Sequence, residues 1–296
     1  MVSKNMVKNK IKNISLTHLI RWIKWFLFDR HIPITIINDC RDSNAEGRIV
    51  TRLASLLPLS EISFVGVKDD IEAAFCLVDI LDALEGRKGI IIINVAPRHG
   101  IAKCWTNGTP FGEIKIGRTI IFSTVDGHVF SLIQNILGCK LHIKLYDIPE
   151  VVTHMELTLE LQSQIIKSQF RSFDFLPRLV AMRVKGKDFP YTVTTVKNDI
   201  AEMVGFTDVF GNIKTTIIYK GQYKTGVFFK RFKVGSIPLS EIKFYFRLKD
   251  VPDGELAVIV GSSGLGESRF LEIVVQGQSA SKKLGYPQAG TPIKIL

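Results

Sequence analysis

The sequence lacks the cysteine pairs that metal sites and disulfide frameworks use. Its four cysteines stand about thirty residues apart and form no C-x-x-C pair: Cys40, Cys76, Cys104 and Cys139. Zinc sites and small disulfide-rich domains need closer spacings. His18, His31, His142 and His154 also have no carboxylate or histidine partners at metal-ligand spacing. We therefore expect no metal site, and buried thiols in a reducing cytoplasm.

Several catalytic and cofactor motifs are also missing. The chain contains no G-x-S-x-G elbow and no cysteine–histidine pairing, and no G-x-G-x-x-G follows its first predicted strand. These absences disfavour a serine hydrolase, a cysteine nucleophile and a dinucleotide-binding site. We expect no cofactor.

The apolar segment "LTHLIRWIKWFLF" at 16–28 is too short to span a bilayer and ends in no small-residue cleavage site. Two interpretations stay open for this basic extension, residues 1–30. The favoured one is a helix that packs on the domain or on a neighbouring subunit. The other is an amphipathic helix that makes weak contact with a membrane surface. A cytoplasmic protein is expected in either case.

Positive charge is concentrated at the N-terminus. The formal net charge is +11, and the first thirty residues supply +6 of it, from seven Lys and Arg against Asp29. The rest of the chain therefore carries only about +5. No module that interleaves aromatic and basic residues is present, so no nucleic-acid partner is expected.

The first half of the chain alternates between strand and helix patterns. Strands are predicted at 32–37, 61–67, 89–95, 118–124 and 140–147, and helices at 46–57, 70–86, 128–137 and 152–170. Such alternation predicts an open, mostly parallel sheet with helices on both faces. We assign this α/β domain to residues 31–187.

Residues 188–296 have a different pattern, with short strand-like pieces at close spacing and turns between them. They include "TVTTV", "KTTIIY", "ELAVIV" and "RFLEIVV". This pattern predicts a smaller antiparallel β-barrel domain. At 296 residues with 46% hydrophobic composition, the chain is long enough for two cores.

The segment "GSSGLGES" at 261–268 has the glycine spacing of a phosphate-binding loop. Its lysine position, however, holds Glu267, whose carboxylate would repel phosphates, and the following "RFLEIVV" has strand composition. We reject a triphosphate site. A hairpin remains, which presents Ser268 and Arg269 and suits a single carboxylate; a merely solvated turn is the other interpretation.

Several segments resemble one enzyme family. "SRFLEIVVQGQSASKKLG" (268–285) with "AGTPIKI", and "DVFGNIKTTI" (208–217), are similar to motifs of the S-adenosylmethionine hydroxide adenosyltransferases and the related fluorinases and chlorinases. "ITIINDCRDSNAEGR" (34–48), "NVAPRHG" (94–100) and "TVDGHVF" (124–130) match weaker motifs in the same order. The resemblance covers residues 31–296 and implies S-adenosylmethionine as substrate.

The resemblance also implies binding roles. Asp39 would accept the ribose hydroxyl protons, although a helix cap is the other interpretation for this residue. In the second half, Asp208 would hold the ammonium, Asn212 would pair with adenine, and Ser268 with Arg269 would take the carboxylate. Phe210 belongs to the same motif as Asp208, and Ala280 would offer main-chain groups beside the adenine. Family members are trimers with sites between subunits, so a homotrimer is implied here.

The family's water-activating trio of Asp, Arg and His is replaced by Ala96, Lys103 and Arg171. We predict that His99 is the base and Arg98 its helper in hydrolysis to adenosine and methionine. The other interpretation is that both residues only form hydrogen bonds with the loop and the neighbouring subunit. A non-catalytic protein that binds S-adenosylmethionine or adenosine is the alternative. Halide transfer is weaker, because the halogenating branch has an inserted loop that the short interval 101–124 lacks.

Overall fold

The structure is a computed structural model that describes residues 32–96, 108–196, 200–229, 232–239, 242–295. The predicted N-terminal extension, residues 1–30, lies outside these ranges. So do three positions that the sequence analysis singled out: Arg98, His99 and Lys103.

The first half forms a seven-stranded sheet with the order β2-β1-β3-β5-β4-β6-β7. Parallel ladders join β2, β1, β3 and β5, and antiparallel ladders join β5, β4, β6 and β7. A mostly parallel sheet is thereby confirmed for the half that carries Asp39, one part of the predicted site. The strands are β1 Pro33–Asn38, β2 Glu61–Gly66, β3 Gly89–Asn94, β4 Phe111–Ile116, β5 Thr119–Thr124, β6 His142–Tyr146 and β7 Thr192–Thr195.

Helices cover both faces of this sheet, and each face has its own apolar core. One core contains side chains of α3 Ser43–Leu56, α6 Ile148–Thr153, α7 Leu159–Lys167, α8 Arg171–Asp174 and α9 Leu176–Val184. The other contains side chains of α4 Asp70–Ala83 and α5 Ser131–Leu137. Asp42 and Asp69 cap α3 and α4 by accepting two backbone N–H bonds each.

Several elements of the first half differ from the prediction, which included neither α8 nor α9. The single helix predicted over 152–170 is wrong, because the chain forms α6 and α7 with a break between them. The side chain of Thr158 accepts a hydrogen bond from the Leu161 backbone N–H and so starts a new helix at Leu159. Strand β4 was not predicted; its Glu113 and Lys115 interrupt the apolar pattern.

The second half forms a mostly antiparallel six-stranded sheet, in which only β13 and β14 pair in parallel, and a separate three-stranded sheet. The larger sheet contains β8 Val204–Thr207, β9 Ile213–Tyr219, β10 Phe228–Phe229, β13 Ile242–Tyr245, β14 Leu256–Leu265 and β15 Ser268–Val275. The smaller sheet contains β11 Phe232–Val234, β12 Ile237–Leu239 and β16 Ile293–Ile295. Two short helices, η2 Leu248–Asp250 and α10 Ala280–Lys283, lie outside both sheets. Closure of these strands into a barrel stays a prediction. Strand β7, beyond the predicted boundary at residue 187, pairs with β6 in the first sheet.

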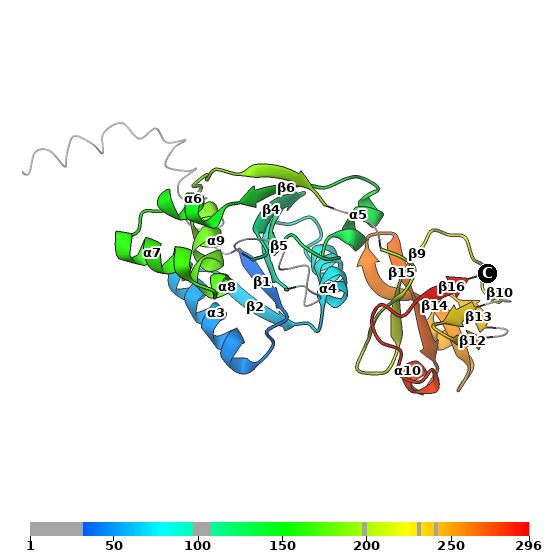
Figure 1. Cartoon of the computed structure of the whole chain (residues 1–296). Coiled ribbons are helices and arrows are strands. Elements are labelled where there is room, and N and C mark those ends of the chain that lie inside the picture. The colour runs from blue at the N-terminus through cyan, green and yellow to red at the C-terminus, as the bar shows by residue number, and fades with distance from the viewer. Residues whose placement is uncertain (1–31, 97–107, 197–199, 230–231, 240–241, 296) are drawn as a thin grey trace, which may run out of the picture.

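Helix α4 lies between the first sheet and the second half of the chain (Figure 1). Its Phe75 is fully buried and makes edge contacts with Phe206 of β8 and Phe270 of β15, at centroid distances of 5.4 and 4.9 Å. Gly205 allows this approach, because a Cβ there would lie 2.0 Å from the Phe75 ring. The two halves of the chain therefore share an aromatic contact through α4.

The exposure of the cysteines only partly matches the prediction. Cys40 and Cys139 are exposed, so the expectation of buried thiols is wrong for these two, while burial raises the pKa of Cys76 to about 12.

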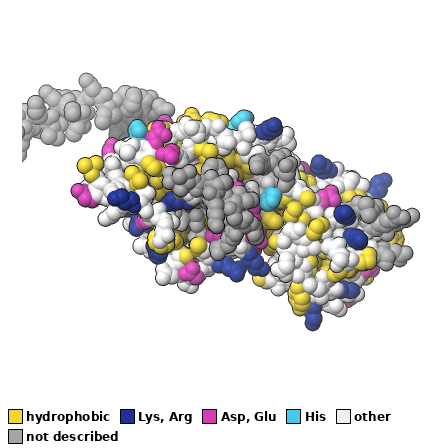
Figure 2. All heavy atoms as spheres, viewed as in Figure 1, with side chains coloured by type: hydrophobic (Ala, Val, Ile, Leu, Met, Phe, Trp, Pro, Cys, Tyr) yellow, Lys and Arg dark blue, Asp and Glu magenta, His cyan; other side chains and the backbone are white. Residues whose placement is uncertain are grey.

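Lys and Arg side chains are spread singly over the face drawn in Figure 2, with Asp and Glu side chains on the same face. No helix within the described ranges is long and apolar enough to cross a membrane.

A buried carboxylate links the sheet to α9. Glu113 of β4 is 5% exposed; it accepts hydrogen bonds from Arg183 Nε at 2.6 Å and from the Tyr146 hydroxyl at 2.8 Å. Burial raises the pKa of Glu113, but the hydrogen bonds from Arg183 and Tyr146 outweigh it, so the net pKa is lowered. The charged form is therefore the one the fold needs.

We predict that Glu113→Gln lowers the free energy of unfolding by about 3 kcal/mol at neutral pH, because it removes the buried counter-charge of Arg183 and leaves the exposed Asp188 as the remaining carboxylate partner among the described residues. Since folding lowers the pKa of Glu113, its stabilisation is present above the ordinary value of 4.5 and is lost as the pH falls through the folded value. Urea unfolding from pH 7 to pH 3 should show the difference from wild type shrinking. Glu156→Gln, in the surface pair with Lys187, is the control; an equal loss there would contradict the prediction.

Candidate functional site

A cavity of about 390 Å³ opens at the carboxyl ends of the parallel strands. We call it the edge cavity. Open α/β sheets bind ligands at this edge, because the loops that follow the strands meet there. Its described lining residues are Asp39, Cys40, Asn94, Ala96, Thr109, Phe111, Thr124, Gln169, Phe170, Arg171, Ser172 and Phe173.

The ends of β1 and β3 fix Asp39 in this cavity. The Asp39 N–H donates to the Asn94 carbonyl at 3.2 Å, and its Oδ2 accepts from the Ala96 N–H at 3.2 Å. Asn38, fully buried behind it, accepts from Asn94 Nδ2 at 2.9 Å, and no described residue offers an acceptor to Asn38 Nδ2. The cap of α3 is Asp42 rather than Asp39, so helix capping does not account for Asp39.

Arg171, the first residue of α8, is distant from Asp39 in the sequence but lines the same cavity. Its guanidinium carbon lies 6.0 Å from the centroid of the Phe111 ring. Gly108 packs directly against it, since a Cβ there would lie 2.1 Å from an Arg171 Nη atom. Burial lowers the pKa of Arg171, and within the described ranges its guanidinium makes no hydrogen bond or ion pair.

The edge cavity thus gathers three positions that the family resemblance associates with one ligand. They are Asp39, Ala96 and Arg171, far apart in the sequence. Neither Ala96 nor a guanidinium can accept a proton at neutral pH. The predicted base His99 and its helper Arg98 lie outside the described residues, directly after the strand end that carries Ala96.

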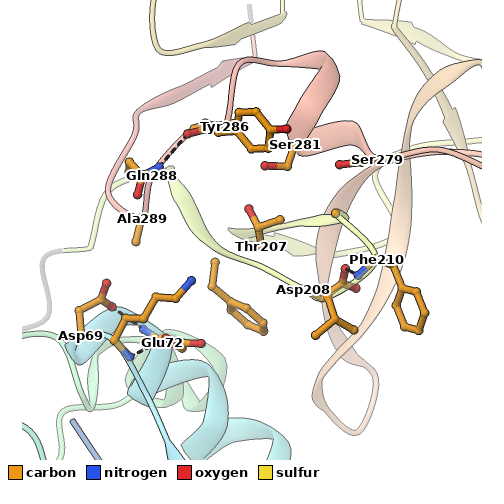
Figure 3. A pocket seen from close by; sticks show the side chains of 15 residues that line it. Asp69, Glu72, Thr207, Asp208, Phe210, Ser279, Ser281, Tyr286, Gln288 and Ala289 are labelled. Carbon is orange, nitrogen blue, oxygen red and sulfur yellow. Dashed lines mark hydrogen bonds between the residues drawn. The ribbon is translucent and has the colours of Figure 1, made fainter. Parts of the chain in front are cut away.

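A second cavity, of about 500 Å³, lies between the N-terminal end of α4 and the second half of the chain. We call it the domain cavity. Figure 3 shows Asp69 and Glu72 on its α4 side, with Thr207, Ser281 and Tyr286 across from them. It shares no described lining residue with the edge cavity. Of its described lining residues, only Asp208 and Phe210 were expected from the sequence.

The 208–212 segment forms a closed turn on the wall of the domain cavity. Asp208 Oδ1 accepts from the Phe210 and Asn212 backbone N–H groups at 2.9 Å each, and its Oδ2 accepts from Asn212 Nδ2 at 3.0 Å. Asp208 and Asn212 therefore bind each other, while Phe210 is 78% exposed. Gly211, with φ of +85°, packs against Ser279, the cap of α10, and Ala280 is buried behind it.

The glycine-rich segment is a hairpin, as predicted, and it docks on α4. Gly266 turns the chain at φ +57° between β14 and β15. Asp79 accepts from the Ser263 hydroxyl at 2.9 Å and the Gly264 N–H at 3.0 Å. Burial raises the pKa of Asp79, although both hydrogen bonds oppose that shift.

Arg269 pairs with a carboxylate of the same chain. Its Nη1 donates to Asp82 Oδ2 at 2.8 Å and to the carbonyls of Ser262 and Gly264. A hydrogen bond from the Gly266 N–H, and then Arg269, lower the pKa of Asp82. Ser268 precedes Arg269 at the start of β15, and neither is among the described residues that line the two cavities.

A buried ion pair beneath the hairpin could not be read from the sequence. Lys214 of β9 and Glu272 of β15 are 7% and 5% exposed and form a salt bridge; Glu272 also accepts from the Ser262 N–H at 3.0 Å. Their pairing depends on the antiparallel register of β9 with β15. No group of three or more potential metal ligands occurs in the part of the chain that the structure describes.

Comparisons with known proteins support the fold alone. No family model matches the chain, and no curated protein matches it. The structure is similar to that of an uncharacterized conserved protein from Thermotoga maritima, with a TM-score of 0.65 and 19% identity over 89% of this chain and 100% of that one. It also resembles a conserved hypothetical protein from Thermus thermophilus, with a TM-score of 0.55 and 18% identity over 90% and 100% of the two chains.

We predict that Asp82 and Arg269 couple energetically in folding. Because both side chains are 29% exposed and joined by a charge-assisted bond, a double-mutant cycle with Asp82→Ala and Arg269→Ala should give a coupling of about 1 kcal/mol. Urea unfolding of the four proteins measures it, and the same cycle on the surface pair Arg247–Asp250 should give less. Zero coupling would contradict the prediction, because it would show that the contact between Asp82 and Arg269 adds nothing to stability.

Proposed function

We propose that the protein binds S-adenosylmethionine in the edge cavity and hydrolyses it to adenosine and methionine. The observation that carries this proposal is the meeting of positions 39, 96 and 171 at one cavity on the carboxyl edge of the parallel sheet. At position 39 the sequence resembles the S-adenosylmethionine hydroxide adenosyltransferases, and at positions 96 and 171 it departs from them. A volume of about 390 Å³ also lies within the range of small-molecule sites.

In this proposal Asp39 accepts hydrogen bonds from the ribose hydroxyls. Its Oδ2 accepts a hydrogen bond from the Ala96 N–H, and its backbone N–H donates to the Asn94 carbonyl at the end of β1, so the carboxylate needs little reorganisation to bind a diol. Water then attacks the ribose C5′ in line with the C5′–sulfur bond. The sulfur takes the bonding electrons and leaves as neutral methionine, and the proton of the attacking water passes to a base, which we assign to His99.

The Asp208 turn would complete the site from a neighbouring copy in a homotrimer. Val209 and Phe210 at its tip are 95% and 78% exposed, which is unusual for two adjacent apolar residues unless a partner covers them. Within one chain the turn lines the domain cavity and not the edge cavity. An arrangement between subunits would bring the two halves of the predicted site together.

One observation favours the alternative, a non-catalytic protein that binds S-adenosylmethionine or adenosine. Among the described lining residues of the edge cavity, Asp39 is the only carboxylate and no histidine is present. Hydrolysis therefore depends on groups outside the described residues, whereas binding does not.

The first test incubates the full chain with S-adenosylmethionine, with and without chloride, and follows adenosine, methionine and 5′-chloroadenosine by chromatography. Calorimetry in parallel measures binding. Adenosine and methionine support hydrolysis; binding without products supports the alternative; 5′-chloroadenosine would establish halide transfer. Absence of both binding and products would overturn the proposal.

We predict that Asp39→Ala weakens binding of adenosine about 10- to 100-fold, because it removes charge-assisted hydrogen bonds to the ribose. Asp250→Ala changes an exposed carboxylate in the second half of the chain and should leave the affinity unchanged. Equal affinities of Asp39→Ala and wild type would exclude Asp39 from the site.

If the chain hydrolyses its ligand, His99→Ala should lower kcat about 10²- to 10⁴-fold, the usual contribution of a general base, with little change in ligand affinity. His142→Ala, an exposed histidine on β6, serves as the control. Unchanged turnover in His99→Ala would remove it from the mechanism.

A further inference from the structure

A third cavity adjoins the edge cavity at Arg171. Its volume is about 360 Å³, and its described lining residues are Gly108, Ile148, Pro149, Ile166, Lys167, Ser168, Gln169 and Arg171. Gln169 and Arg171 line both cavities, so the two spaces meet at this pair of residues. The edge cavity contains Asp39, whereas the described lining of the third contains two cations and no carboxylate.

Arg171 is built into this wall in a way that leaves its donors unused. A guanidinium has five N–H donors, and a half-buried one without acceptors loses hydration that nothing replaces. Those of Arg171 find no acceptor among the described residues, in contrast to Arg183, which donates to Glu113, and Arg178, which donates to the Asp174 carbonyl. Gly108 leaves room for the guanidinium here, because a Cβ at this position would lie 2.1 Å from an Arg171 Nη atom.

The other polar groups nearby are already engaged. The Ser168 hydroxyl donates to Asp174 Oδ2 at 2.6 Å and accepts from the Phe170 N–H at 3.0 Å, so it is not the acceptor for Arg171. Asp174 itself lies 3.7 Å from Arg52. Lys167 ends α7, where the helix carbonyls carry partial negative charge, so its ammonium contributes less net attraction to an anion than Arg171 does.

We propose that Arg171, assisted by Lys167, binds an oxyanion of the ligand that occupies the edge cavity. The inference rests on the proposed function in placing the ribose at Asp39. It adds that the ligand extends past Arg171 and carries a carboxylate or a phosphate there, since planar guanidinium groups bind both through paired hydrogen bonds. The carboxylate of S-adenosylmethionine and the phosphate of an adenine nucleotide are the two sources of this chemistry.

The experiment compares two matched pairs of ligands by calorimetry on the full chain. The first pair is adenosine and adenosine 5′-monophosphate, which differ by the phosphate. The second is 5′-methylthioadenosine and S-adenosylhomocysteine, which differ by the amino-acid portion with its carboxylate. We expect the oxyanion member of at least one pair to bind about tenfold tighter, and the pair with the larger ratio identifies the source.

The variants separate a specific role of Arg171 from general charge. Arg171→Gln should bring the affinity ratio close to one, Arg171→Lys should keep part of it, and Lys167→Gln should reduce it less than Arg171→Gln. Arg118→Gln, on the exposed turn between β4 and β5, removes the same charge and should leave the ratio intact. Thermal unfolding of each variant establishes that it folds.

Ratios near one for both pairs in the wild type would overturn the inference while leaving adenosine binding, and so the proposed site, in place. A ratio that persists in Arg171→Gln would overturn it as well. If none of the four compounds bound, the inference and the placement of the ribose at Asp39 would both fall. Hydrolysis of S-adenosylmethionine is measured in a separate assay, by the release of adenosine.

Discussion

The structure depends on α4 being buried on two sides at once. One side of this helix packs under the parallel sheet, in the core that contains Ile91, Ile93 and Ile121. The other receives Phe206 and Phe270 against Phe75, together with the hairpin that hydrogen-bonds to Asp79 and Asp82. A helix that is apolar around most of its circumference must be covered all round. The second half of the chain provides the missing cover.

Because α4 is buried on both sides, the carboxylate of Asp79 loses part of its hydration. A partly desolvated carboxylate is unfavourable unless hydrogen bonds replace its hydration, and Ser263 and Gly264 supply two. Gly264 is required because the two strands of the hairpin approach closely: a Cβ there would lie 2.2 Å from the Ser268 carbonyl oxygen. The resemblance of this segment to a phosphate-binding loop therefore comes from tight β-hairpin geometry, in which glycine serves the backbone and not an anion.

The sequence was sufficient to predict the elements that follow from a local hydrophobic pattern. It was insufficient for the elements that depend on pairing with a distant part of the chain. Apolar runs identified β1, β3 and β5, and with them the edge at which Asp39 lies. Strand β4 has mixed composition and is a strand because β5 and β6 flank it. Likewise, nothing in the sequence near Arg269 indicates Asp82, because their contact arises only when the hairpin meets α4. The role predicted for Arg269, binding the carboxylate of a ligand, stays a prediction; its contact with Asp82 is known only from the fold.

The exchange of residues at positions 96 and 171 changes the electrostatics of the edge cavity. Relative to the family that the sequence resembles, an acid is replaced by Ala96 and a titratable base by the permanent cation Arg171. If S-adenosylmethionine binds in this cavity as we propose, a cation near its sulfonium would raise the energy of the bound ligand, because like charges repel in a partly desolvated space. The repulsion is relieved if an anionic group of the ligand lies between the two charges, and S-adenosylmethionine has such a group. In the proposed hydrolysis, proton transfer would fall to a residue other than these two, so binding and chemistry would depend on different parts of the loop edge.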